Sequence, residues 1–348
     1  MLVVLGGSSP WTVDLIERLD PEAVLLVGRD ADALDALRRF LGKRSGATIR
    51  TSTEPEEALT EASAVLCQAR LGGWEGRQMD ETGAWRAGGY ADETLGLGGL
   101  RAALRARDTL ARWACAAGTA PVVMLSNPTD LLTRWWRLHS EALGISACEV
   151  PSELMVDLPP GTRYLGVNHL GWAVTPAGER VATRWVTLLE SGRPEQSASR
   201  IRRAGDLAAL SSDLRRAIAA DDHESFDELI LRRPPRWYAQ LVVPVLRALL
   251  DDPHSFRGVV GLPNGARLPG LPPDLMVESL GSAVEPDPNA LPTELVGDIA
   301  RFARARDHAW NVLTNPCEDT LQQSIAADPF SGNVKCSREL LSWVVGAR

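Results

Sequence analysis

The sequence lacks the segments that direct a chain into or across a membrane. No apolar run reaches the roughly 18–20 residues that a membrane helix needs. The chain opens on the apolar run Met1–Leu5, without the basic stretch and small-residue cleavage site of a signal peptide. The five cysteines are widely spread and form no C-x-x-C pair, which indicates neither a disulfide framework nor a zinc knuckle. We therefore expect a cytoplasmic protein with no membrane partner.

Basic residues are scarce relative to acidic ones. The 37 lysines and arginines are outnumbered by 45 aspartates and glutamates, which gives a net charge of −8. An acidic chain argues against a nucleic acid as partner. Hydrophobic residues make up 45% and charged residues 24%, an ordinary globular composition that excludes a disordered, collagen-like or coiled-coil chain. A length of 348 residues corresponds to about two domains.

The first 150 residues alternate short apolar runs with helical patterns. The runs expected to be strands are residues 1–5, 23–27, 48–51, 64–67 and 121–125, with a long helix over 100–117 between the last two. Strands that alternate with helices form βαβ units and a parallel sheet. The pattern predicts an α/β protein in which residues 1–150 form a Rossmann-type, doubly wound, dinucleotide-binding domain.

The pattern changes after residue 150. Residues 164–174 and 180–188 flank a turn at 175–179 and are expected to form an antiparallel hairpin. Helices are expected near 197–221, 236–251 and within 293–345, and strands at 256–262 and 275–284. We therefore expect residues 151–348 to form an α+β domain packed against the first.

The first strand ends in a short turn, Gly6, Gly7, Ser8 and Ser9, that opens a helix. Glycine lets the backbone approach a pyrophosphate, and a helix N-terminus favours negative charge. The G-x-G-x-x-G spacing is absent, so a dinucleotide loop and a plain tight turn remain equally open from these residues alone.

An acid that would bind the cofactor ribose is expected at the end of the second strand. Gly28 occupies the strand end instead, followed by Arg29 and Asp30. Arg29 could meet the 2′-phosphate of NADP, and Asp30 could either contact the ribose or, as we favour, cap the next helix.

Seven short motifs follow one another along the chain. They are Gly6–Ser9, Arg70–Gly73, Glu93–Gly99, Asn127–Pro128, Cys148–Pro151, Asn168–Trp172 and Asn264–Pro272. In this order the chain resembles glycoside hydrolase family 4, whose members depend on NAD and a divalent metal, and it resembles a shortened and divergent member. The resemblance implies a lactate-dehydrogenase-like arrangement of the two domains and a homo-oligomer.

The resemblance also implies an unusual route to glycoside cleavage, because this family departs from the usual pair of carboxylates. In the family, bound NAD⁺ oxidises the sugar at C3 and a metal ion helps to acidify the proton on C2. A tyrosine removes that proton, the aglycone leaves by elimination, water adds and the hydride returns. The implied partner is a small glycoside or sugar.

The family roles fall on particular residues of this sequence. Cys148 and His169 match the manganese ligands, and Tyr238 matches the base. Arg70, Glu93, Asn127, Asn168 and Asn264 match positions at the substrate. From the residues alone, a buried cysteine and a sheet histidine are the favoured interpretations of the first two, and an amphipathic tyrosine at a helix start would explain the third.

Four departures from the family pattern keep other functions open. Glu149 follows the cysteine, where it could act as a general acid on the leaving group. Ser8 replaces a glycine, Gly28 and Arg29 replace the ribose-binding acid, and residues 234–237 precede Tyr238 where small glycines are usual. The cofactor could therefore be NAD or NADP. A sugar or cyclitol dehydrogenase or epimerase, and a non-catalytic nucleotide- or sugar-binding protein, are the alternatives.

Overall fold

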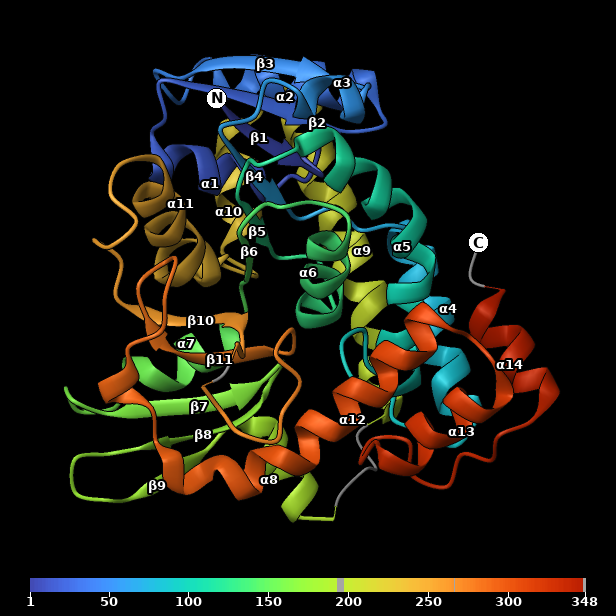
Figure 1. Cartoon of the computed structure of the whole chain (residues 1–348). Coiled ribbons are helices and arrows are strands. Elements are labelled where there is room, and N and C mark those ends of the chain that lie inside the picture. Colours follow the sequence, from blue (N-terminus) through green and yellow to red (C-terminus); the bar gives the residue numbers. More distant parts are fainter. Residues whose placement is uncertain (193–196, 266, 347–348) are drawn as a thin grey trace.

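The computed structural model describes residues 1–192, 197–265 and 267–346, which contain one eleven-stranded sheet (Figure 1). The strands lie in the order β3-β2-β1-β4-β5-β6-β10-β11-β7-β8-β9. Their bounds are β1 Leu2–Leu5, β2 Ala23–Val27, β3 Thr48–Ser52, β4 Ala64–Cys67, β5 Val122–Met124, β6 Gly144–Ser146, β7 Arg163–Val167, β8 Leu170–Val174, β9 Arg180–Ala182, β10 Gly258–Pro263 and β11 Met276–Gly281.

The sheet has two parts that differ in strand direction. From β3 to β6 all neighbours are parallel, and from β6 to β9 all neighbours are antiparallel. The parallel part has the strand order of a doubly wound nucleotide-binding fold, with the reversal of strand order between β1 and β4. In Figure 1 its blue strands lie at the top and the green strands β7, β8 and β9 at the bottom. The predicted α/β fold is confirmed.

Helices cover both faces of the parallel part, and further helices lie elsewhere in the described residues. The helices are α1 Thr12–Leu19, α2 Ala31–Leu41, α3 Pro55–Leu59, α4 Gly73–Arg86, α5 Gly96–Ala117, α6 Thr129–Leu138, α7 Glu149–Val156, α8 Arg184–Glu190, α9 Ser197–Ala219, α10 His223–Ile230, the π-helical η2 Tyr238–Val242, α11 Val243–Leu250, the short 3₁₀ turns η3 Pro288–Ala290 and η4 Thr293–Leu295, α12 Val296–Thr314, α13 Glu318–Ala327 and α14 Arg338–Val345.

The alternation of side chains along β1 divides the core. Leu2 and Val4 pack with α1, α2, α9, α10 and α11 on one face. Val3 and Leu5 pack with α3, α5, α6, α12, α13 and α14 on the other. All four residues are fully buried because a parallel sheet is covered on both sides. The carboxyl ends of these strands are therefore held by an apolar core on both faces.

The predicted hairpin of residues 164–188 is wrong in its boundaries. Residues 164–174 do not form one strand, because the chain reverses at Asn168 and His169, so that β7 pairs with β8 from Arg163–Val174 to Val167–Leu170. Only Arg180–Ala182 continues the sheet as β9, and Thr183 then caps α8 by accepting from the Val186 amide at 3.4 Å. The hairpin predicted across 175–179 is therefore the pairing of β8 with β9.

Helices α4, α6 and α7, which directly follow β4, β5 and β6, were not predicted. In α4 the reason is that the buried residues include Arg77, Asp80 and Glu81, so the apolar repeat of an amphipathic helix is absent. The predicted helix at 236–251 is divided, since its first part is the π-helical segment η2. Predicted helices at 197–221 and within 293–345 are present as α9, α12, α13 and α14.

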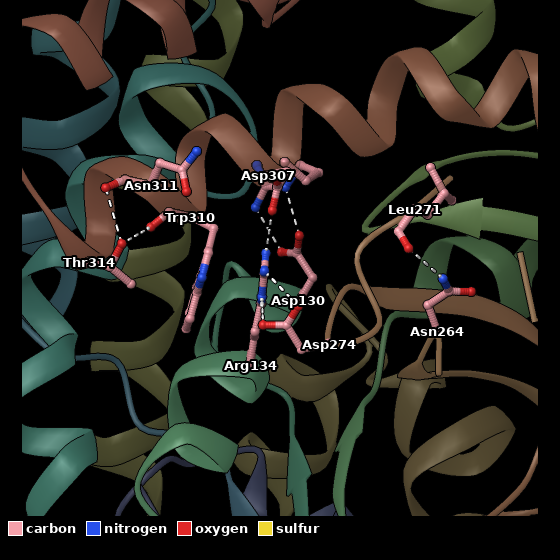
Figure 2. A network of polar contacts seen from close by, with 10 residues as sticks. Asp130, Arg134, Asn264, Leu271, Asp274, Asp307, Trp310, Asn311 and Thr314 are labelled. Carbon is pink, nitrogen blue, oxygen red and sulfur yellow. Dashed lines mark hydrogen bonds and ion pairs between the residues drawn. The ribbon is translucent and has the colours of Figure 1, made fainter. Parts of the chain in front are cut away.

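Helix α12 is held against α6 by buried ion pairs (Figure 2). Arg306 of α12 donates to both carboxylate oxygens of Asp130 at 2.6 and 2.7 Å. Arg134, on the next turn of α6, donates to Asp274 at 2.7 and 2.8 Å and to Asp307 at 3.0 Å. Because the Asp130 and Arg306 side chains are each less than a tenth exposed, this pair is shielded from solvent.

Among the described residues, no helix has both the length and the apolar character that crossing a membrane requires. The sheet runs from β6 directly into β10, so both halves of the chain share it. The division of the chain into domains 1–150 and 151–348 stays a prediction.

Candidate active site

A cavity of about 640 Å³ opens at the carboxyl ends of the parallel strands. Residues directly after each of the six parallel strands line it. A ligand site is expected here, because the loops diverge where the strand order reverses. The residues singled out from the sequence that line the cavity are Gly6, Ser8, Ser9, Arg29, Arg70, Glu93, Asn127, Cys148, Glu149, His169 and Tyr238. Gly7, Asp30, Asn168 and Asn264 do not line it.

The first wall of the cavity is the turn after β1. Gly6 has a φ of +82°, and a Cβ on it would lie 2.7 Å from the backbone of Ala69, which follows β4. A Cβ on Gly7 would lie 2.8 Å from Leu26 on β2. Both glycines therefore allow the turn to pack directly on the two strands beside β1. The turn leaves Ser8 and Ser9 facing the cavity, and Gly7 beneath it.

Two departures from the family pattern are explained by one contact. A Cβ on Gly28 would lie 2.8 Å from the Ser8 hydroxyl oxygen, so the serine occupies the space that a larger residue at 28 would need. Arg29 comes next and lines the cavity. Asp30 is exposed, and its carboxylate accepts from the Ala33 amide at 3.0 Å as the N-cap of α2. The expected capping role of Asp30 is observed.

A cluster of charges lies beside the turn after β4. Glu93 pairs with Arg70 and, at 2.8 Å, with Arg77 of α4. Burial alone would raise the pKa of Glu93. The two guanidinium groups outweigh this effect and hold that pKa well below its usual range. The Arg70 guanidinium also lies over the Trp74 ring, 4.3 Å from its centroid. Glu93 is therefore a fixed negative charge on the cavity wall, held between two arginines.

The opposite wall contains a cysteine and a histidine in contact. Cys148 Sγ lies 3.3 Å from Nδ1 and 3.6 Å from Nε2 of His169. Cys148 caps α7 and His169 belongs to the reversal between β7 and β8. Burial lowers the pKa of His169 to about 3, so its imidazole is neutral and free to bind a metal. Burial, with Glu278 nearby, raises the pKa of the Cys148 thiol well above its usual value.

The reversal that carries His169 is strained. Asn168 has a φ of +58° and His169 a φ of +154°, conformations that residues other than glycine rarely adopt. The Thr183 hydroxyl donates to the His169 carbonyl at 2.7 Å and helps to hold the turn. A strained backbone that aims a histidine into a cavity is a feature of functional sites.

Glu278 of β11 completes a group of three buried ligand atoms. One of its carboxylate oxygens, Cys148 Sγ and a ring nitrogen of His169 all lie within 4.8 Å of one another. Burial raises the pKa of Glu278 to about 8. Sequence reasoning missed this residue, although the signal was present as a lone acid in the otherwise apolar and small run 276–281.

Tyr238 is buried in η2 and reaches the turn after β4. Its hydroxyl donates to Gln68 Oε1 at 2.6 Å, and the Gln68 amide donates to Thr12 of α1 at 2.9 Å. Burial raises the pKa of the Tyr238 phenol. Arg236, two residues before this tyrosine, is exposed and does not line the cavity.

Sequence reasoning also missed Arg233. It lines the cavity and packs on two indole rings, 5.6 Å from the Trp11 centroid and 4.6 Å from that of Trp237. No carboxylate among the described residues forms an ion pair with Arg233. This guanidinium is therefore a cation held between aromatic rings and available to an anionic ligand.

No protein-family model matches the chain. The 6-phospho-beta-glucosidase BglT of Thermotoga maritima is 28% identical over 195 residues, which are 49% of this chain and 46% of that protein. The 6-phospho-alpha-glucosidase 1 of Lacticaseibacillus paracasei is 31% identical over 141 residues, which are 35% of this chain and 31% of that protein. The chain is a divergent relative of the family 4 glycosidases. Its matches span less than half of the length of these curated relatives.

Solved structures extend the family 4 likeness over the whole fold. A Thermotoga maritima 6-phospho-beta glucosidase, solved with NAD and glucose-6-phosphate, has a TM-score of 0.78 at 18% identity and covers 99% of this chain and 98% of its own. A 6-phospho-alpha-glucosidase from gut microorganisms, solved with NAD and Mn²⁺, has a TM-score of 0.69 at 18% identity, covering 99% and 97%. A lactate dehydrogenase from a deep-sea metagenome has a TM-score of 0.51 at 11% identity, covering 93% and 98%. The predicted lactate-dehydrogenase-like arrangement is confirmed.

Two asparagines of the family 4 motifs serve the backbone rather than the cavity. Asn168 is fully buried in the β7–β8 reversal, where its amide donates to the Thr94 carbonyl at 3.4 Å. Asn264 donates to the carbonyls of Leu268 and Leu271, each at 3.1 Å, and accepts from the Leu268 amide at 3.0 Å. Figure 2 shows the bond to Leu271. In this chain these side chains shape the loops that bear the family 4 motifs.

Glu149, the departure next to the family 4 cysteine, lies in the cavity beside Cys148. Burial and the neighbouring Glu153 raise its pKa, while Arg184 and Arg233 oppose the shift. Its nearest ion-pair partner is Arg184, at 3.8 Å. A carboxyl group with a raised pKa at a cavity wall can supply a proton to a leaving group.

Proposed function

We propose that this chain is a glycosidase that depends on a nicotinamide cofactor and a divalent metal, as the family 4 resemblance implies. One observation carries the proposal. Residues from six of the seven motifs, together with Tyr238, line one cavity at the strand ends. The turn after β1 forms one wall of this cavity and the Cys148–His169 pair forms the other.

The cofactor would lie against the turn after β1. Gly6, Ser8 and Ser9 supply a close backbone approach and the N-terminal end of α1, which suit a pyrophosphate. Arg29 lies at the end of β2, where an NADP 2′-phosphate would be bound. A bound nicotinamide supplies the capacity to accept and return a hydride.

Cys148 and His169 fit a divalent transition metal, because a thiolate and a neutral imidazole are both good ligands for such ions. The unpartnered oxygen of the buried Glu278 beside them adds to this fit. A metal bound here would supply Lewis-acid stabilisation of a negative sugar oxygen.

Glu149 and Tyr238 are the groups of this chain that would move protons. Glu149 would hold a proton on its carboxyl group and give it to the departing aglycone oxygen. Tyr238 holds its proton in the bond to Gln68 Oε1, and it must lose that proton before it can accept one from C2. Burial raises the pKa of Tyr238, and the positive charge of Arg233 opposes that rise only in part.

We further propose an anionic sugar as substrate, because the relatives are named for 6-phosphorylated glucosides. Arg233 is the group that would pair with the anion, since no described carboxylate pairs with it and it lies between Trp11 and Trp237. The test is incubation with NAD⁺ or NADP⁺, Mn²⁺ and aryl glucosides with and without a 6-phosphate. Aglycone release without net reduced cofactor is expected, and its absence with every substrate and both cofactors contradicts the proposal.

A second candidate is a sugar dehydrogenase or epimerase that uses the same cavity. The bond from Tyr238 to Gln68 favours it in the direction of reduction, because a phenol that keeps its proton can give it to a carbonyl oxygen as hydride arrives at the carbon, but cannot remove a proton from C2. In the same assay, net growth of reduced cofactor at 340 nm indicates a dehydrogenase, and an isomerised sugar indicates an epimerase. Assembly as a homo-oligomer and location in the cytoplasm stay predictions, the first of which light scattering on the purified protein tests.

A further inference from the structure

Glu278 lies in a row of glycines across the antiparallel part of the sheet. On one side it is in register with Gly261 of β10, and on the other with Gly166 of β7, which is in turn opposite Gly171 of β8. Residues in register point to the same face of a sheet, so the carboxylate has no side chain directly beside it. Glycine within strands marks a place where another group approaches closely.

The group that fills part of this space is the Tyr164 hydroxyl. A Cβ on Gly166 or on Gly171 would overlap the Tyr164 hydroxyl oxygen, so both glycines are needed to admit it. Tyr164 is fully buried and donates to Glu278 Oε2 at 3.4 Å. The second carboxylate oxygen, Oε1, is buried and has no hydrogen-bond partner among the described residues. This leaves a carboxylate that is supported on one side and unpaired on the other.

Resting on the metal site of the proposed function, we infer that Glu278 is a third protein ligand of that metal, together with Cys148 and His169. The three ligand atoms already lie within 4.8 Å of one another, and Sγ and Nδ1 are 3.3 Å apart. Metal–ligand bonds of roughly 2.0–2.4 Å place ligand atoms at such separations. Only small shifts of these side chains are needed to enclose an ion.

Charge supports the same assignment. A buried carboxylate without a partner for one oxygen is costly, and no described lysine or arginine pairs with Glu278. A thiolate and a carboxylate together balance the charge of a divalent cation, and the neutral imidazole completes the set. Cys148 and His169 line the cavity whereas Glu278 lies behind them, so the open positions of the ion face the cavity.

The experiment measures the affinity of the metal-free protein for Mn²⁺ and for Cd²⁺ by calorimetry. Glu278→Gln keeps the shape and removes the anionic ligand. Because Mn²⁺ prefers oxygen ligands and Cd²⁺ prefers thiolate, the variant is expected to bind Mn²⁺ at least tenfold more weakly and Cd²⁺ less than threefold more weakly. Glu81→Gln, the same change at another buried glutamate, is the matched control and is expected to leave both affinities unchanged.

The possible outcomes separate this inference from the proposed function. Unchanged Mn²⁺ binding in Glu278→Gln overturns the inference alone, and so does an equal loss for both ions, which indicates a residue that only orients the ligands. Failure of the wild-type protein to bind either ion overturns the metal part of the proposed function and this inference with it.

A second measurement applies if Glu278→Gln does not fold. Glu149, the carboxyl group in the cavity beside Cys148, is changed to glutamine so that it gives no signal. This Glu149→Gln protein is labelled with ¹³C-carboxyl glutamate, and its infrared difference spectrum is recorded on addition of Mn²⁺. A labelled carboxylate band that shifts with one equivalent of Mn²⁺ supports the third ligand. Absence of any labelled band from the difference spectrum overturns it.

Discussion

The two parts of the sheet build their sides of the cavity in different ways. The strands β1 and β2 of the parallel part are apolar on both faces, and the turn that begins at Gly6 presents backbone to the cavity. The antiparallel part carries buried polar side chains on the sheet itself, with Glu278 on β11 and His169 between β7 and β8. The parallel side is shaped by a glycine that lacks a side chain, and the antiparallel side by the polar side chains of Glu278 and His169.

The difference has an energetic reason. A cavity wall made of backbone, like the turn after β1, needs only close packing, which an apolar core and a glycine supply. Buried ionisable groups cost free energy unless a partner compensates them. The turn after β1 therefore needs no bound group for charge balance, whereas the Cys148, His169 and Glu278 group depends on an ion for it. Substitutions on the two sides should accordingly fail in different measurements.

The largest effect is expected at Tyr238, which lies between the two sides. Tyr238→Phe removes only the hydroxyl, and loss of a general base lowers turnover roughly 10²–10⁴-fold. Substrate affinity should change little, because the ring remains in place. Steady-state kinetics of aglycone release measures this, with Tyr90→Phe, at a tyrosine outside the cavity lining, as control. A Tyr238→Phe protein with more than about a third of wild-type turnover contradicts the base role.

The next largest effect is expected on stability, at the buried ion pair between α6 and α12. Asp130→Ala leaves Arg306 buried without its partner and should lower the free energy of unfolding by about 3–5 kcal/mol. Asp35→Ala breaks exposed pairs with Arg38 and Arg39 and should lower the free energy of unfolding far less. Urea denaturation measures both. Equal effects of the two substitutions would show that the pair beneath α12 is not shielded from solvent.

The free energy of unfolding is expected to depend on pH through Glu81, a buried acid in the parallel part. Burial raises the pKa of Glu81 from its usual 4.5 to about 7, against the opposing charge of Arg77. A raised carboxyl pKa gives stability that is complete below pH 4.5 and is lost as pH rises through 7. Between these limits wild type should lose roughly 3 kcal/mol relative to Glu81→Gln.

Chemical denaturation of both proteins at pH 5 and pH 8 measures this loss. A difference in unfolding free energy between the two proteins that is the same at both pH values contradicts the shift at Glu81.

The smallest effect concerns cofactor choice on the backbone side. Arg29 faces the cavity and Asp30 caps α2, so nothing at the end of β2 repels a 2′-phosphate. We expect NADP⁺ to bind at least as well as NAD⁺, and Arg29→Ala to weaken NADP⁺ roughly tenfold, about 1.4 kcal/mol, while sparing NAD⁺. Tryptophan fluorescence, with Trp11 and Trp74 at the cavity, reports the titrations. Wild-type NAD⁺ binding more than tenfold tighter than NADP⁺ would contradict this.

The sequence by itself determined the parallel half. The strands β1 to β5 and the cap at Asp30 follow from local rules, because apolar runs, turns and caps are read within a few residues. The motifs likewise identified the side chains that gather at the cavity, including Cys148 and His169. Helix α4 could not be predicted from the sequence, because its buried face is charged and the regular spacing of apolar residues that marks an amphipathic helix is absent.

Only the tertiary structure decided which of the motif residues face the cavity. The Asn168 side chain bonds to the Thr94 carbonyl and that of Asn264 to its own loop, while Gln68 reaches Tyr238 across 170 positions of the chain. Arg233 belongs to no local pattern, and the lone acid Glu278 stands out in its strand without revealing its role. Both roles arise from Trp11, Tyr164 and Cys148, which folding brings to them. The physical reason is that periodicity encodes burial along one element, whereas a buried charge is defined by partners distant in sequence.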